Sequence, residues 1–267
     1  MSTTSVPLPA WRRSADGSAP GCRALLIDGT ADELFQLPDP AGPLSLDGSD
    51  LIGCVLEDGP GSDLVRSFLG GRVHRWMTWR DLRVAPPGDR PEQLIVSAEA
   101  WRRHGAIIWS ELAARRMYIA LQPEAEWGRV VVAVQRSADA GALLRQARRP
   151  GWKAPTIVHA SWPSSTLAAA AALGGLSGAY YPLGDDFASR LRDRVDVDGS
   201  TPTCTAEGPA SRVVREAAIR LEADLLVMGW HHHRLPWPKL VHPTAWHLSR
   251  SVPMNVLLIA LDGGEQA

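Results

Sequence analysis

The stretch "RVVVAVQRSADAGALL", residues 129–144, decides the fold. It opens with an almost continuous apolar run, which is typical of a strand buried on both faces of a parallel sheet. A helix follows, with Ser137 as its expected cap and an apolar face made by Ala140, Leu143, Leu144 and Ala147. A buried strand that leads at once into an amphipathic helix predicts an α/β protein.

The same alternation extends in both directions from this stretch. Towards the C-terminus we expect helices beginning at Pro209 and covering 244–250, and strands at 155–162, 223–229 and 255–261. Towards the N-terminus we expect helices beginning at Ser62 and covering 99–116, and strands at 22–28, 50–57, 72–79, 93–98 and 117–121. This repeated plan predicts a parallel sheet covered on both faces by helices.

The chain divides into three parts on this interpretation. Residues 1–21 are rich in Ser, Pro, Ala and Gly, and we expect them to form a disordered arm. Residues 22–121 would then form a shortened, degenerate α/β unit, and residues 129–261 a second unit. The stretch "QPEAEWG" (122–128) is the expected linker between the two units.

The composition limits the classes of partner. Hydrophobic residues make up 45% of the 267 residues and the net charge is -1, so we expect a folded core and no nucleic-acid partner. Three scattered cysteines without a CxxC pair indicate a reducing, cytoplasmic location. Residues 164–184 carry no charge, but they are rich in Ala and Gly, so we expect no membrane span.

The second unit resembles the universal stress protein family, a branch of the adenine-nucleotide α-hydrolase-like folds. The resemblance rests on the stretch at 129–144 and on "IVHASW" (157–162), "EADLLVMG" (222–229) and "VPMNVLLIAL" (252–261). The first unit resembles the family more faintly, through "ALLIDGT" (24–30). This implies two units of universal-stress-protein type in tandem. Because members commonly dimerise through the last strand, we expect either a homo-oligomer or a pseudo-dimer in which the two terminal strands pair within one chain.

Nucleotide-binding members carry Gly-x2-Gly-x9-Gly-[Ser/Thr] after the fourth strand, where glycines let backbone N–H groups approach phosphate oxygens. In the same register this chain has Gly229, His232, His242 and Pro243. Bulky rings cannot offer that close approach, and proline has no N–H. The Asp of the family's opening strand is Gln135 here. The resemblance therefore implies a degraded ATP-binding motif. No cofactor is expected, and ATP remains the possible ligand that a binding experiment should test.

The stretch "GWHHHRLPWPKLVHP" (229–243) allows three other interpretations. A metal site is not expected there, since no carboxylate or cysteine accompanies the histidines. Side chains such as His232 and Arg234 could instead bind an anion directly. Trp230, Trp237 and Trp246 could form an aromatic surface for a protein partner, or they could fill space inside the protein.

The function expected from these observations is a non-enzymatic regulatory or binding protein in stress response, which acts through a protein partner. No GxSxG or comparable motif is present, so no catalytic residue is assigned. The alternative is a sensor that binds ATP or another adenine nucleotide, with nucleotide hydrolysis as a weaker option. Candidates for the ligand cleft at the strand ends are Asp28, Thr30, Gln135, Ser137, His159, Gly229, His232, Arg234 and His242.

Overall fold

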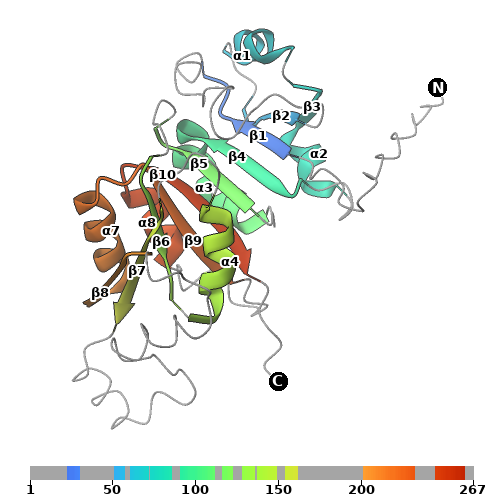
Figure 1. Cartoon of the computed structure of the whole chain (residues 1–267). Coiled ribbons are helices and arrows are strands. Elements are labelled where there is room, and N and C mark those ends of the chain that lie inside the picture. The colour runs from blue at the N-terminus through green and yellow to red at the C-terminus, as the bar shows by residue number, and fades with distance from the viewer. Residues whose placement is uncertain are drawn as a thin grey trace, which may run out of the picture.

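A single ten-stranded sheet forms the centre of the protein, with the strand order β3-β2-β1-β4-β5-β10-β9-β6-β7-β8. Figure 1 shows its two halves side by side. The computed structural model describes residues 23–30, 51–57, 61–71, 73–85, 91–111, 116–122, 128–135, 137–148, 154–161, 201–231 and 244–261. Within each half all strand pairs are parallel, so the predicted α/β fold with a parallel sheet is confirmed.

The first unit contributes five strands in the order β3-β2-β1-β4-β5. They are β1 (Arg23–Ile27), β2 (Leu51–Val55), β3 (Arg75–Thr78), β4 (Gln93–Ser97) and β5 (Arg116–Ala120). The described helices of this unit are α1 (Ser62–Leu69), α2 (Trp79–Val84) and α3 (Ala98–Glu111).

The second unit repeats this strand order, because β8-β7-β6-β9-β10 occupy the corresponding places. The strands are β6 (Val130–Ala133), β7 (Thr156–Ser161), β8 (Thr203–Glu207), β9 (Leu225–His231) and β10 (Asn255–Leu261). The described helices are α4 (Ser137–Ala147), α7 (Ala210–Arg220) and α8 (Thr244–Ser251). In each unit the fourth strand in chain order lies beside the first, so the ends of these two strands are adjacent.

The two units meet where β5 and β10 pair antiparallel, with Val256 opposite Ile119 and Leu257 opposite Tyr118. Pairing of the two terminal strands within one chain was one of the two arrangements raised from the sequence, the other being a homo-oligomer. Beside it, the side chain of Asn255 bonds both backbone groups of Gln122: Nδ2 donates to the carbonyl and Oδ1 accepts from the N–H, each at 2.8 Å. This junction of β5 and β10, which we call the seam, therefore combines the hydrogen bonds of a strand pair with those of the buried Asn255 side chain.

Helices pack on both faces of the sheet, and each face has its own core. Adjacent strand residues point to opposite faces, so Leu26 joins the cluster under α2, α3, α7 and α8, whereas Leu25 joins the cluster under α1 and α4. No helix in the described part of the chain is both long enough and apolar enough to cross a membrane.

Several predicted element boundaries were wrong. The strand expected at 72–79 ends at Thr78, whose side chain accepts a hydrogen bond from the Asp81 N–H and caps α2, a helix that was not predicted. The helix expected to reach residue 116 is described as far as Glu111, and it does not include residue 116, because β5 begins at Arg116. Strand β9 does not stop at Gly229 but continues to His231. β8 was also missed, because its sequence TCTAE is mostly exposed and has no run of large apolar residues; only Cys204 packs against the core among its described residues.

Some predictions fall on residues outside the described ranges. They include the arm at 1–21, most of the linker at 122–128 and the uncharged segment at 164–184. The same holds for His232, Arg234, Trp237 and His242.

Candidate functional site

Three of the predicted cleft residues lie at or near the carboxyl ends of neighbouring strands in the second unit. Gln135 is exposed and follows β6, and Ser137 is half-buried as the first residue of α4. Ser137 is thus inside the helix and not the cap before it. His159 lies in β7, which pairs with β6. The fold therefore gathers these residues at the edge where parallel sheets commonly bind ligands.

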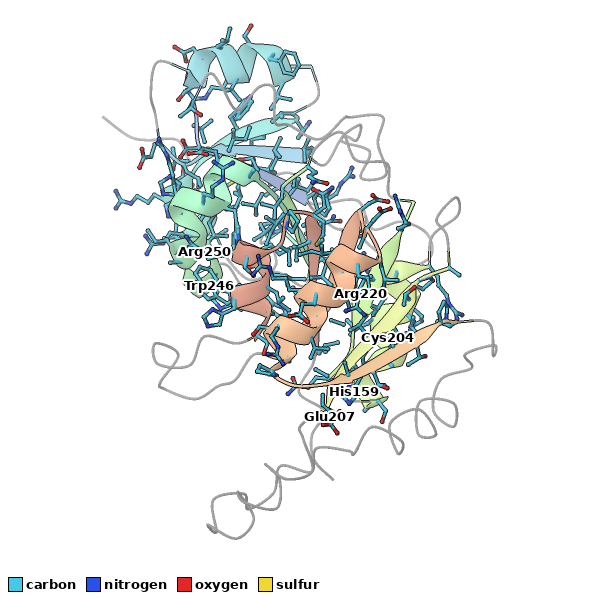
Figure 2. All side chains as sticks on the ribbon, turned by 90° about the vertical axis from the view of Figure 1, so that its left-hand side faces the viewer. His159, Cys204, Glu207, Arg220, Trp246 and Arg250 are labelled. Carbon is cyan, nitrogen blue, oxygen red and sulfur yellow. The ribbon has the colours of Figure 1, made fainter. Side chains whose placement is uncertain are left out.

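His159 connects the ends of β6 and β7 from inside the protein, at the position marked in Figure 2. Its Nδ1 lies 2.9 Å from the carbonyl oxygen of Val134, to which it can donate a hydrogen bond. Burial lowers the pKa of His159 below the ordinary value of 6.5, and the bond to Val134 opposes this shift only in part. We therefore expect a neutral imidazole at pH 7. It holds the backbone carbonyl of Val134 in place and has no positive charge that could attract an anion.

Gly229 was predicted as the first residue of a degraded phosphate motif, whose later residues His232, His242 and Pro243 lie outside the described ranges. It lies inside β9 and pairs with Ile259 of β10, two residues before the strand ends. A Cβ at this position would overlap the side chain of Leu261 and approach Leu143 of α4. A larger residue here would require the side chain of Leu261 to move, so the glycine allows β9 and β10 to pack closely, and this role differs from the approach of a backbone N–H to phosphate.

Trp230 and Trp246 are core residues and not part of a partner surface, which agrees with the second alternative raised from the sequence, that they fill space inside the protein. Their exposed fractions are 5% and 8%. Trp230 meets Trp109 of α3 at a centroid distance of 4.5 Å, and Trp246 of α8 meets Trp101 of α3 at 5.3 Å. The Trp101 Nε1–H donates to the carbonyl of Ser249 at 3.1 Å. These four tryptophans, the tryptophan cluster, therefore join α3 of the first unit to β9 and α8 of the second.

The outer side of this junction is covered by an arginine. In Figure 2, Trp246 and Arg250 lie together on α8, beside α3. The guanidinium carbon of Arg250 lies 5.2 Å from the centroid of the Trp246 ring, within the range of a cation–π contact. The junction is thus covered on this side by a charged residue.

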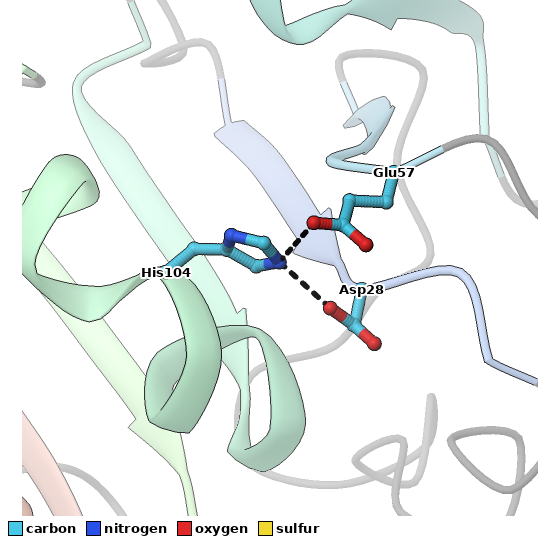
Figure 3. A group of neighbouring side chains, drawn as sticks. All are labelled: Asp28, Glu57 and His104. Carbon is cyan, nitrogen blue, oxygen red and sulfur yellow. Dashed lines mark hydrogen bonds and ion pairs between the residues drawn. The ribbon is translucent and has the colours of Figure 1, made fainter.

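The first unit gathers a charged group around Asp28, the residue that follows β1 (Figure 3). Asp28 is 1% exposed; its Oδ1 lies 2.8 Å from Nε2 of His104, and its Oδ2 lies 3.3 Å from Nη1 of Arg103. Glu57, which lies two residues after β2, places Oε1 3.7 Å from the same His104 nitrogen. Asp28 was predicted as a site residue, whereas its neighbours Glu57, Arg103 and His104 were not.

The turn at Gly29 lets the chain after β1 pack closely against the end of β2. Gly29 has φ +96°, and a Cβ there would overlap the carbonyl oxygen of Glu57 and crowd Ser62. The Glu57 N–H also donates to the Asp28 carbonyl at 3.3 Å. Thr30 follows and is half-buried. The ends of β1 and β2 are therefore held close, and the carboxylates of Asp28 and Glu57 lie at the same edge of the sheet.

In the first unit no loop residues lie between β4 and α3, the helix that follows it. Ser97 is the last residue of β4 and Ala98 is the first residue of α3, and the Ser97 hydroxyl accepts a hydrogen bond from the Ala100 N–H at 3.2 Å. In the family motif a long glycine-containing loop occupies this position. Here the strand end leads directly into α3, which carries Arg103 and His104 to Asp28.

Comparison with known proteins agrees with this architecture. The model of the universal stress protein family matches residues 126–260. A universal stress protein from Archaeoglobus fulgidus DSM 4304 has a TM-score of 0.58 at 12% identity, and the match covers 90% of this chain and 99% of that one. A functionally unknown protein from Pseudomonas aeruginosa PAO1 has a TM-score of 0.49 at 12% identity, over 90% of this chain and 93% of its own.

A universal stress protein solved in complex with cAMP matches 51% of this chain and 98% of its own, with 19% identity and a TM-score of 0.36. None of the curated proteins matches the chain. At 12% identity, the similarity to the Archaeoglobus protein establishes the fold alone, and it extends over both units.

Proposed function

The chain belongs to the universal stress protein family, and from this premise we propose that it is a non-enzymatic regulatory or binding protein of the stress response. On this proposal it acts through contacts with a protein partner, in the cytoplasm, as a tandem pseudo-dimer of two units. ATP is not its resident ligand.

The observation that carries this proposal is the position of Gly229 inside β9. The leucine that packs against this glycine fills the space beside it, and the strand continues for two more residues. A phosphate site of the family type needs glycine backbone N–H groups at the strand end, followed by a helix N-terminus. The direct connection of β4 to α3 supports the same conclusion for the first unit.

Calorimetric titration of the full chain with ATP, AMP and cyclic dinucleotides tests the proposal. We expect no binding heat at micromolar concentrations, and we expect a pull-down to recover a stable partner that is lost in Trp237→Ala. Nucleotide binding that is weakened by His232→Ala or Arg234→Ala, but not by the exposed control Arg215→Ala on α7, would overturn it.

The alternative function is a sensor for ATP or another adenine nucleotide. It is favoured by the exposed Gln135 and the half-buried Ser137 beside the end of β6, where side chains are able to contact a ligand without a glycine loop. In that case Gln135→Ala would weaken nucleotide binding in the same titration. Phosphate release measured alongside would separate a sensor from a hydrolase.

A further inference from the structure

We propose that Asp28, Glu57 and His104 form a binding site for a divalent first-row transition-metal ion, zinc foremost, at the carboxyl edge of the first unit. This inference concerns a different edge of the sheet from the degraded nucleotide motif and does not depend on the proposed function. The sequence did not predict it, because the metal site considered there involved the histidines at 231–233.

The three side chains already converge on one point, as Figure 3 shows. Their ligand atoms all lie within 4.8 Å of one another. Nε2 of His104 lies 2.8 Å from Asp28 Oδ1 and 3.7 Å from Glu57 Oε1. Ligands about 2.0–2.2 Å from a tetrahedral zinc ion stand roughly 3.4 Å apart, so these two distances bracket the required spacing. Side-chain rotation alone can therefore bring the three atoms around an ion.

The chemistry of the three ligands selects the class of metal. One imidazole nitrogen and two carboxylate oxygens suit zinc and its neighbours, whereas calcium and magnesium are bound mainly by oxygen. Three protein ligands would leave at least one position for water. The exposure of Glu57, whose side chain is 63% accessible, gives an ion a route from solvent to the buried Asp28.

The surrounding residues orient the buried ligand. Arg103 approaches Oδ2 of Asp28 and leaves Oδ1 directed at His104. Arg103 is itself held by Glu99, whose Oε1 accepts from its Nε at 2.9 Å. Outer partners of this kind commonly fix the carboxylates that bind metals. Arg103 pairs with both Asp28 and Glu99, so its one positive charge is shared between two carboxylates.

A metal ion is bound by an unprotonated imidazole nitrogen, so Nε2 of His104 would bind the ion in the tautomer that carries its hydrogen on Nδ1. A bound ion would then connect three elements distant in sequence: the ends of β1 and β2, and α3. Zinc should consequently raise the thermal midpoint of the folded protein.

The test is zinc titration of the full chain in which His231, His232 and His233 are all changed to Ala, so that these histidines cannot contribute. We expect one zinc ion per chain, and we expect His104→Ala and Glu57→Gln in this background each to weaken binding at least tenfold. Cobalt provides a second readout, because its visible spectrum responds to the number and geometry of its ligands and should change in His104→Ala. Calcium and magnesium should not compete at equal concentration.

His74→Ala serves as the matched control, because His74 is an exposed histidine of the same unit and should not change the affinity. Glu57→Gln protects the test against misfolding, since that side chain is largely exposed and circular dichroism can confirm the fold. Equal zinc affinity in the background protein, His104→Ala and Glu57→Gln would overturn the proposal. The three side chains would then form only an ion-pair group.

Discussion

At the scale of single residues, His159 couples stability to pH. It is buried where β6 and β7 end, and burial holds its pKa below 6.5 in the folded state. In the unfolded chain the imidazole has an ordinary pKa, so below pH 6.5 the unfolded state binds a proton that the folded state does not. Acid therefore favours unfolding. The free energy of unfolding decreases as the pH falls from 6.5 towards the lower pKa of His159 in the folded state.

We predict that His159→Gln reduces the dependence of stability on pH. Glutamine keeps an N–H that can donate to the Val134 carbonyl, but it does not titrate. Urea unfolding at about pH 7.5 and about pH 5.5 should show a smaller loss of unfolding free energy in the variant than in the wild type. Measurements near about pH 8, where the imidazole is neutral in both states, provide the reference. An unchanged pH dependence would contradict the role given to this residue.

The sequence identified Asp28 as a site residue, but it did not identify Glu57 or His104, which lie beside it. Asp28 was recognisable because it ends a buried strand. Glu57 carries the same signal, since it lies just after β2, which pairs with β1. His104 carries no such signal, because its place near Asp28 depends on how α3 packs, and that contact spans 76 residues.

At the scale of elements, the tryptophan cluster fixes α3 against β9 and α8. Trp109 and Trp230 meet edge to face at 4.5 Å, and the same Trp109 lies 5.6 Å from Trp246. Aromatic pairs in this geometry contribute about 0.5–1.5 kcal/mol beyond the area they bury. The cluster joins a helix of the first unit to a strand and a helix of the second, so we expect its contacts to affect the stability of the whole sheet.

We predict a measurable coupling between Trp109 and Trp230. In a double-mutant cycle with Trp109→Leu and Trp230→Leu, chemical denaturation should give a coupling free energy of about 0.5–1.5 kcal/mol. Pairing Trp109→Leu with the exposed, distant Ile219→Ala on α7 should give a value near zero. Coupling near zero for both pairs would mean that the two rings only fill volume.

Element types were predictable from the sequence where apolar periodicity was strong, and boundaries were not. Buried strands such as β1 and β6 have continuous apolar runs, whereas the exposed edge strand β8 has none. The end of β9 was placed at Gly229 because glycine usually marks a turn. The packing of Leu261 against that glycine is a tertiary contact, and no local pattern reports it.

At the scale of the whole molecule, the seam between β5 and β10 makes one sheet from two units. Asn255 is fully buried there, and it satisfies both backbone groups of Gln122. Removing a buried partner leaves polar groups without hydrogen bonds, at a cost of about 1–3 kcal/mol. The stability of the seam thus depends on an amide side chain as well as on the ladder.

We predict that Asn255→Ala lowers the free energy of unfolding by about 1–3 kcal/mol, and that the wild type unfolds in one transition because its sheet is continuous. Urea denaturation followed by circular dichroism measures both quantities. Thr203→Ala, at the exposed edge in β8, should change the stability little. Two separate transitions in the wild type would show that the units unfold independently of the seam.

The antiparallel seam also has a genetic consequence. In an assembly of two identical chains, every substitution arises on both sides of the symmetry axis. Here both sides are encoded by one polypeptide, so a substitution changes one side and spares the other. An aspartate follows the first strand of one unit and a glutamine follows that of the other. Fusion lets the two edges of the sheet inherit different chemistry while they still stabilise each other.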